Sequence, residues 1–327
     1  MTESNNDKPG LHIPPRFIPT PTTISPEAQA FMSMQIPIVP LPDLADKPGW
    51  RKYIDGMNQM ITGQTSMLAQ PYPADSIAHK LSASTLYEVK PKTLQAKNEK
   101  RAILFAHGGG FVLGGGMAVV YAAQPMASLA QTRIYSLDYR MPPDYPFPAP
   151  LDDVVEAYRW LLERYEPENI AFWGGSAGGN LAAAAILKAR DVGLPMPAAC
   201  ALQSPAVDCT ESGDSYETNR MLDILLKERS PQLFTLYAGG HDLRDPILSP
   251  VFADYSQGFS PTILVSGTRD LLLSSTVNLH RALRRAGVEA ELHIWEAMCH
   301  MPFIGAPEEK EVMMEQICFL RKHTTAS

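Results

Sequence analysis

The chain has 327 residues, of which 45% are hydrophobic and 19% charged, and it carries a net charge of −7 at pH 7. This length and composition predict one large globular core with a smaller appendage, and they exclude a disordered chain. The acidic balance argues against a nucleic-acid partner, because phosphate binding needs clustered Lys and Arg.

No apolar run approaches the ~20 residues that cross a bilayer, so we expect no membrane partner. The four cysteines are scattered and form no CxxC pair. This pattern predicts reduced thiols in a cytoplasmic protein, in place of a zinc site or a disulfide framework.

Prolines crowd the first 73 residues and exclude that region from the core of a sheet. Two helices are nevertheless predicted there. One covers residues 25–35, with Ser25 as N-cap, and the other covers residues 50–63 and ends at Gly63.

From about residue 80, strands and helices alternate. We expect strands at 84–89, 101–106, 133–139, 169–173, 198–204, 262–267 and 290–295. We expect helices between them at 118–131, 149–165, 178–189 and 275–287. This alternation predicts an α/β fold with a doubly wound, mostly parallel sheet and helices on both faces.

One interval of about fifty residues, between the strands at 198–204 and 262–267, has helix signals but no convincing strand. A gap of that length inside a compact domain is typical of a structured insertion.

Residues 174–178, GGSAG, match GxSxG at a predicted strand-to-helix turn. Such a turn holds its serine in strained backbone geometry beside the positive end of a helix. A glycine-rich phosphate loop is the alternative, but neither GxGxxG nor a P-loop lysine accompanies the motif. We therefore interpret Ser176 as a nucleophile.

A serine nucleophile needs a base, and the base needs an orienting acid. His300 lies just past the predicted strand 290–295, at the edge where open α/β sheets place their chemistry. It is the predicted base, with a structural histidine as the alternative. The aspartates considered for the acid are Asp223, Asp242, Asp245, Asp254 and Asp270.

Among these aspartates, only Asp270 closes a strong predicted strand, so it is the predicted acid. The alternative is that Asp270 caps the helix that starts near Ser274. The chain order Ser, Asp, His is the one expected for an α/β-hydrolase. A mechanism of this kind needs no metal and no cofactor.

The segment HGGGF, residues 107–111, follows the strand at 101–106. Consecutive glycines let backbone N–H groups converge on one point, as an oxyanion hole requires. The expected donors are the N–H groups of Gly109, Gly110 and Ala177. We expect Gly108 to shape the turn and His107 to brace the loop, with a plain glycine turn as the alternative.

Together these segments resemble the bacterial hormone-sensitive-lipase-like esterases of the α/β-hydrolase fold. The resemblance covers about residues 80–305 and rests on HGGGFVLGG, LDYRMPPDYPFPAPLDDVVEAYRWL, GGSAGGNLAAA, TRDLLLS and CHMPF, in the family's order. It implies a serine carboxylesterase that hydrolyses short- to medium-chain carboxylic esters through an acyl-enzyme intermediate.

The resemblance also implies a helical cap built from the N-terminal segment and the insertion. The expected division is a first cap part at 1–75, a catalytic core at 76–208 and 259–327, and a cap insertion at 209–258. Apolar cap residues are interpreted first as packing and second as an acyl pocket. The candidates for substrate binding are Phe111, Phe234 and Tyr237.

Three departures from the family pattern stand out, one of which is that RDLLLS lacks the proline and the second aspartate often found after the acid. Gly175 stands where the family commonly has Asp or Thr. Asp144, in YRMPPD, is expected to replace a glutamate that braces Tyr139 and Arg140.

Two other functions share parts of this residue pattern. A lactone hydrolase would use the same triad, so a small-molecule ester or lactone is the expected partner. A non-catalytic ligand receptor derived from a hydrolase typically loses a triad member, which retention of Asp270 and His300 argues against. A homo-oligomer is left open.

Overall fold

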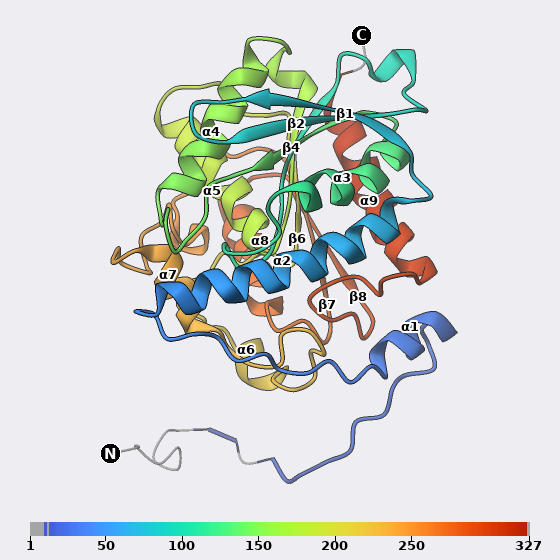
Figure 1. Cartoon of the computed structure of the whole chain (residues 1–327), viewed down its shortest axis with the longest axis vertical. Helices are drawn as coiled ribbons and strands as arrows, with labels where there is room; N and C mark the ends of the chain where they lie inside the picture. The colour runs from blue at the N-terminus through green and yellow to red at the C-terminus, as the bar shows by residue number, and fades with distance from the viewer. Residues whose placement is uncertain (1–9, 12, 326–327) are drawn as a thin grey trace.

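The computed structural model describes residues 10, 11 and 13–325 and centres on one eight-stranded sheet (Figure 1). The strand order is β1-β2-β4-β3-β5-β6-β7-β8, with β2 antiparallel to both of its neighbours and all other pairs parallel. The predicted doubly wound, mostly parallel sheet is confirmed. The strands are β1 (Ala74–Lys80), β2 (Thr85–Pro91), β3 (Ala102–Ala106), β4 (Arg133–Asp138), β5 (Ile170–Gly175), β6 (Ala199–Gln203), β7 (Thr262–Gly267) and β8 (Ala290–Trp295).

Helices cover both faces of the sheet, because successive strand residues point to opposite sides. Leu104 belongs to the core that packs against α4 (Ala149–Leu162), α5 (Ala177–Asp191) and α8 (Leu273–Arg285). Ile103 belongs to the opposite core, against α3 (Met117–Ala130) and α9 (Pro307–His323). Neither β1 nor α9 was predicted from the sequence. β1 is a polar edge strand without apolar alternation.

The N-terminal segment contributes two helices, as predicted, although residues 1–9 and 12 lie outside the described part of the chain. α1 (Pro26–Met32) begins at the predicted N-cap, where the Ser25 hydroxyl accepts the N–H of Ala28 at 3.1 Å. α2 (Lys47–Ala69) runs straight through Gly63, so the predicted end there is wrong. One glycine in a helix costs about 1 kcal/mol, which the rest of a long helix offsets.

The insertion contains helices and no strand over residues 209–258, all of which the structure describes. Its elements are α6 (Ser215–Thr218), α7 (Pro231–Ala238) and the short 3-10 helix η4 (Pro250–Phe252). Figure 1 places α7 beside the left end of α2 and α6 below α2, with α2 crossing in front of the sheet. Two further 3-10 turns are η2 (Ala96–Asn98) and η3 (Pro167–Asn169).

Among the described residues, no helix has both the length and the apolar character needed to cross a membrane.

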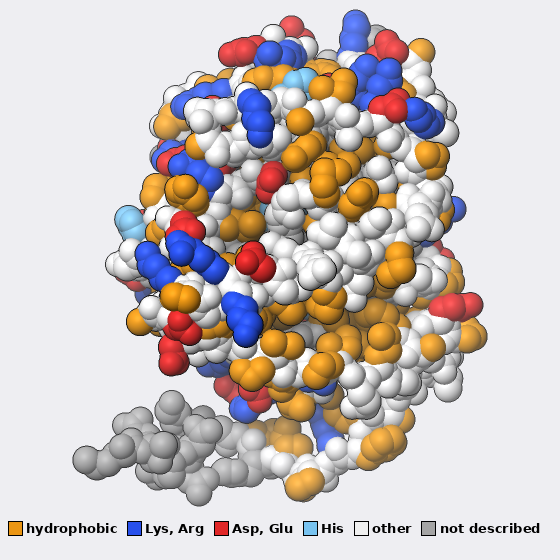
Figure 2. Space-filling view, viewed as in Figure 1, with side chains coloured by type: hydrophobic (Ala, Val, Ile, Leu, Met, Phe, Trp, Pro, Cys, Tyr) orange, Lys and Arg blue, Asp and Glu red, His pale blue; other side chains and the backbone are white. Residues whose placement is uncertain are grey.

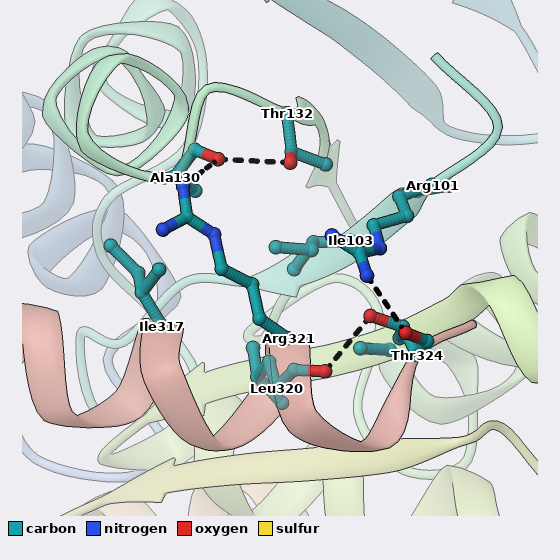
Figure 3. Close-up of a pocket in the computed structure, with 10 residues that line it drawn as sticks. Arg101, Ile103, Ala130, Thr132, Ile317, Leu320, Arg321 and Thr324 are labelled. Atoms are coloured by element: carbon teal, nitrogen blue, oxygen red, sulfur yellow. Dashed lines mark hydrogen bonds between the residues drawn. The ribbon is translucent and has the colours of Figure 1, made fainter. Parts of the chain in front are cut away.

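The amino-terminal edge of the sheet is closed by two arginines that cap helix C-termini (Figure 3). Arg321 donates to the carbonyl of Ala130, the last residue of α3, at 2.7 Å. Arg101 donates to the carbonyl of Thr324, the C-cap of α9, at 2.9 Å. Cations suit these negative helix ends. The cavity between them measures only about 10 Å³, which is about enough for one water molecule.

Arg321→Ala should lower the free energy of unfolding by about 2 kcal/mol, because it leaves helix carbonyls without a charged donor. Lys322→Ala is the matched control, since the neighbouring lysine forms exposed ion pairs and a cation–π contact with Phe319, and its effect should be much smaller. Urea unfolding followed by circular dichroism measures both. Equal destabilisation by the two variants would contradict the capping role of Arg321.

Candidate active site

The turn that carries Ser176 joins β5 to α5 at the carboxyl edge of the sheet. β5 ends at Gly175 and α5 begins at Ala177, so the serine alone makes the turn. Its backbone angles, φ 54° and ψ −123°, are rare outside glycine, and such strain clusters at functional sites. The Ser176 N–H donates to the carbonyl of Gln203 (2.9 Å), and the Ser176 carbonyl accepts the N–H of Ala206 (3.0 Å). These bonds hold the strained turn.

Packing requires the first and last glycines of the motif. A Cβ on Gly174 would lie 2.2 Å from the carbonyl oxygen of Gly178, and a Cβ on Gly178 would lie 1.9 Å from that of Ala106. Gly175 differs, because its Cβ would meet nothing closer than the carbonyl oxygen of Gln203, at 3.7 Å. The turn therefore has room for a side chain at the position where this chain departs from the family pattern.

The loop 107–111 packs directly on the serine turn. A Cβ on Gly108 would lie 3.3 Å from the Cβ of Ser176. The backbone turns at Gly109 and Gly110, whose φ values are 115° and 59°. Within the part of the chain that the structure describes, the N–H groups of Gly109, Gly110 and Ala177 have no protein acceptor. They remain available to an anion formed beside the serine.

His107 braces this loop through contacts of its ring and its backbone. Its Nδ1 forms a hydrogen bond with the carbonyl oxygen of Gly108 at 2.7 Å, and its ring stacks on Tyr139 with 4.2 Å between ring centroids. The Tyr139 hydroxyl also donates to the carbonyl of His107 at 2.8 Å. Burial lowers the pKa of His107, which favours the neutral ring. These contacts fit the predicted supporting role.

Asp270 and His300 meet at the same carboxyl edge. They follow the neighbouring strands β7 and β8, and 3.3 Å separates Oδ1 of Asp270 from Nδ1 of His300. Asp270 is fully buried and His300 is nearly so. The carboxylate also accepts the hydroxyl of Ser266 and the N–H of Leu272. The structure thus brings the predicted acid and the predicted base together, as the strand order implied.

The pair sets the charge of both groups. Burial alone would lower the pKa of His300, but the hydrogen bond and charge of Asp270, with the charge of Asp223, raise it above its ordinary value. Burial alone would raise the pKa of Asp270, but its bond to His300 and the charge of that imidazole lower it. The arrangement therefore favours an ionised acid beside a base that readily holds a proton.

The structure records no hydrogen bond between the Ser176 hydroxyl and His300, both of which lie in the described part of the chain. Catalytic hydrogen bonds are often long without substrate, so this does not separate the two groups functionally. Their pairing stays a prediction.

A sequence profile described as alpha/beta hydrolase fold matches residues 103–304. The match runs from β3 to the loop after β8 and includes Ser176, Asp270 and His300. The chain belongs to the α/β-hydrolase fold family.

Two curated relatives of this α/β-hydrolase match over 208 residues. An acetyl-hydrolase from Streptomyces hygroscopicus is 34% identical, and the match covers 63% of this chain and 69% of the relative. Carboxylesterase NlhH from Mycobacterium tuberculosis is 33% identical, with coverage of 61% and 65%.

Solved structures extend the similarity over nearly the whole chain. The crystal structure of an esterase gives a TM-score of 0.90 at 33% identity and covers 97% of this chain and 99% of its own. An esterase of the bacterial hormone-sensitive lipase family gives 0.76 at 29% identity, with 92% and 99% covered. The predicted resemblance to that esterase family is confirmed.

Aromatic rings join the insertion of this α/β-hydrolase to its glycine loop. Phe111 stacks on Tyr237 with 3.7 Å between centroids, and Phe234 meets Phe111 edge-on at 6.1 Å. All three rings are buried, which supports the packing interpretation and leaves substrate contact a prediction. Leu233, which was not predicted, lies against the glycine loop, because its Cδ1 is 2.9 Å from where a Cβ on Gly110 would be.

Asp223 is a second buried acid at this edge, and its place was not predicted. It was considered as the triad acid, yet its Oδ2 accepts the N–H of His300 and the N–H of Leu271, both at 3.0 Å. Its position inside the insertion gave no signal of these contacts, because they depend on how the insertion folds back.

The prediction that Asp144 braces Tyr139 and Arg140 is wrong. Arg140 pairs with the buried Asp153 of α4, with 2.7 Å between Nη2 and Oδ1. Asp144 pairs instead with Arg51 of α2 at 2.9 Å on the surface. A buried carboxylate needs a cation more than an exposed one does, so Asp153 is the favoured partner.

Gly174→Ala should destroy the serine turn and lower the free energy of unfolding by about 3 kcal/mol, because its methyl group overlaps the Gly178 carbonyl. Gly175→Ala is the matched control and should fold normally and keep most of its esterase turnover. Thermal unfolding and p-nitrophenyl acetate hydrolysis report on both variants. A stable, active Gly174→Ala enzyme would refute the steric argument.

Proposed function

We propose that this α/β-hydrolase is a serine carboxylesterase that hydrolyses short- to medium-chain carboxylic esters through an acyl-enzyme. The observation that carries the proposal is the buried Asp270–His300 pair at the same sheet edge as the strained Ser176 turn. The names of its relatives, acetyl-hydrolase, carboxylesterase and esterase, agree with this reaction class.

In the first half-reaction, Nε2 of His300 takes the proton of the Ser176 hydroxyl while the oxygen attacks the ester carbonyl. Asp270 holds Nδ1–H and so keeps the imidazole in the required tautomer. The negative oxygen of the tetrahedral intermediate accepts the N–H groups of Gly109, Gly110 and Ala177. His300 then protonates the leaving alcohol, and the acyl group remains on the serine.

In the second half-reaction, His300 takes a proton from water, and the hydroxide attacks the acyl-enzyme at the same oxyanion site. Collapse of that intermediate releases the carboxylic acid and returns the proton to Ser176. Each oxyanion donor of this kind contributes about 3 to 4 kcal/mol in comparable sites. The chemistry is supplied by side chains and backbone groups of this chain.

The cap sets which ester reaches the serine in this proposal. Asn58 of α2 accepts the N–H of Gly114 at 2.8 Å, and Leu233 of α7 covers Gly110, so both cap parts support the oxyanion loop. Exposed apolar side chains lie on α2 and on the segment before it, and Figure 2 shows hydrophobic side chains gathered there. Such a surface suits the hydrophobic part of an ester.

The division into cap and core at 1–75, 76–208, 209–258 and 259–327 belongs to this proposal. The absence of a nucleic-acid partner and the cytoplasmic location stay predictions.

Ser176→Ala should lower turnover of p-nitrophenyl butyrate by about 10⁴-fold or more, because it removes the nucleophile. Ser82→Ala, at a remote turn where the serine bonds only Glu156, is the control and should match wild type. A fluorophosphonate should label wild type and Ser82→Ala but not Ser176→Ala. Substantial turnover by folded Ser176→Ala would end the assignment, and an unlabelled, inactive wild type would favour the ligand-receptor alternative.

The pH profile of kcat/KM on a neutral ester should rise along an acid limb whose apparent pKa lies above the ordinary histidine value of about 6.5. The base works only when neutral, and Asp270 and Asp223 favour its protonated form, so the rise occurs at higher pH. Asp270→Asn should move this limb to lower pH and reduce kcat by about 10⁴-fold. A limb that stays in place in Asp270→Asn would show that His300 does not titrate there.

A further inference from the structure

The side chain of Asp223, in the insertion, is fully buried and accepts four backbone N–H groups. Its Oδ1 accepts those of Leu225 (2.9 Å) and Leu226 (3.0 Å) in its own turn. Its Oδ2 accepts those of Leu271 and His300, both at 3.0 Å, from the two catalytic loops. One carboxylate therefore joins the insertion to the loop of the acid and to the loop of the base.

The bond pattern exceeds what a turn of the insertion needs. A short polar side chain that accepts Leu225 and Leu226 would be enough to hold that turn. The second oxygen instead bridges His300 and Leu271, the residue after Asp270. Because one atom accepts both N–H groups, it fixes the separation of the two loops where the acid and the base are attached.

Asn219 strengthens the same connection as a hydrogen-bond donor, whereas Asp223 is an acceptor. Its side-chain amide donates to the carbonyl of Asp270 at 2.8 Å and to that of Thr268 at 3.2 Å. It also accepts the N–H of Asp223 through its backbone carbonyl. The turn at 219–226 thus binds both carbonyl and N–H groups of the acid loop.

Burial of a charged carboxylate at Asp223 costs free energy, and its hydrogen bonds alone do not explain why a charged group is found there. Burial and the neighbouring charge of Asp270 raise the pKa of Asp223, whereas His300 and the backbone donors of Leu271 and Leu226 lower it. The negative charge of Asp223 is favourable when His300 is protonated, because it stabilises the imidazolium. That ion is the transient species of acyl transfer.

The geometry points to Asp223 as a positioning residue of the catalytic pair, one that fixes His300 against Asp270 through the shared Oδ2 and stabilises the imidazolium during acyl transfer. This inference rests on the proposed roles of Ser176, Asp270 and His300. Asp223 itself touches neither the substrate nor the serine in this scheme.

The titratable groups that face Asp223 come from both catalytic loops. The acid loop supplies Asp270, and the base loop supplies His300 and Cys299. Burial, with the charge of Asp223, raises the pKa of Cys299 to about 12, so its thiol stays neutral at working pH. The turn of Asp223 itself contributes only backbone N–H groups. The acid limb therefore reports mainly on Asp270, Asp223 and His300.

The test compares Asp223→Asn with Asp208→Asn. Asp208 is the matched control, since it is a buried acid near the same insertion that binds only its own turn, through Thr210 and Ser212. Asp223→Asn should lower kcat by about 10- to 100-fold with little change in KM, as loss of a partner that orients a catalytic group does. It should also move the acid limb of kcat/KM to lower pH, while Asp208→Asn leaves the limb in place.

Active-site titration with a fluorophosphonate normalises each rate to the folded fraction, so partial misfolding does not change the position of the limb. Asp223→Ser is the second variant and is measured if Asp223→Asn does not fold. An unmoved limb with wild-type kcat overturns the inference, and failure of both variants to fold overturns it by showing a structural role alone. The proposed function falls separately, if Ser176→Ala is active.

Discussion

The buried hydrogen bond between Asp270 and His300 organises the catalytic edge of the molecule. Burial disfavours the charged form of each group, yet together each favours the charge of the other. A buried pair of this kind persists only where other donors satisfy the rest of the carboxylate, as Ser266 and Leu272 do. The loops after β7 and β8 are therefore shaped around one ion pair, and the chemistry proposed for Ser176 depends on the geometry of that pair.

A second constraint is the close packing of β3, β5 and α5. The parallel register sets Ala106 opposite Gly174, so the loop that leaves β3 lies beside the turn that leaves β5. Because Gly178 packs on the Ala106 carbonyl, the contact that excludes a side chain there also holds the loop 107–111 against Ser176. The glycines thus serve sheet packing and site geometry at once.

Segments far from the core in sequence complete this edge. The carbonyl of Pro19 accepts a hydrogen bond from Arg269, next to the acid, and Asn58 accepts the N–H of Gly114, just after the loop 107–111. Asp223 does the same for the base loop. Loops at the carboxyl ends of strands present backbone groups that no ladder satisfies, and side chains of the N-terminal segment and the insertion supply the missing partners.

The parallel sheet, the Ser176 turn and the loop 107–111 could be predicted from the order of the residues, because apolar periodicity and the steric demands of a tight turn are local properties. Chain order and strand ends also singled out Asp270 and His300. The pairing of Asp153 with Arg140 and the contact of Asp223 with the base loop became visible only in the folded chain. Which polar groups are buried together depends on how distant segments pack, and no short pattern of residues encodes that packing.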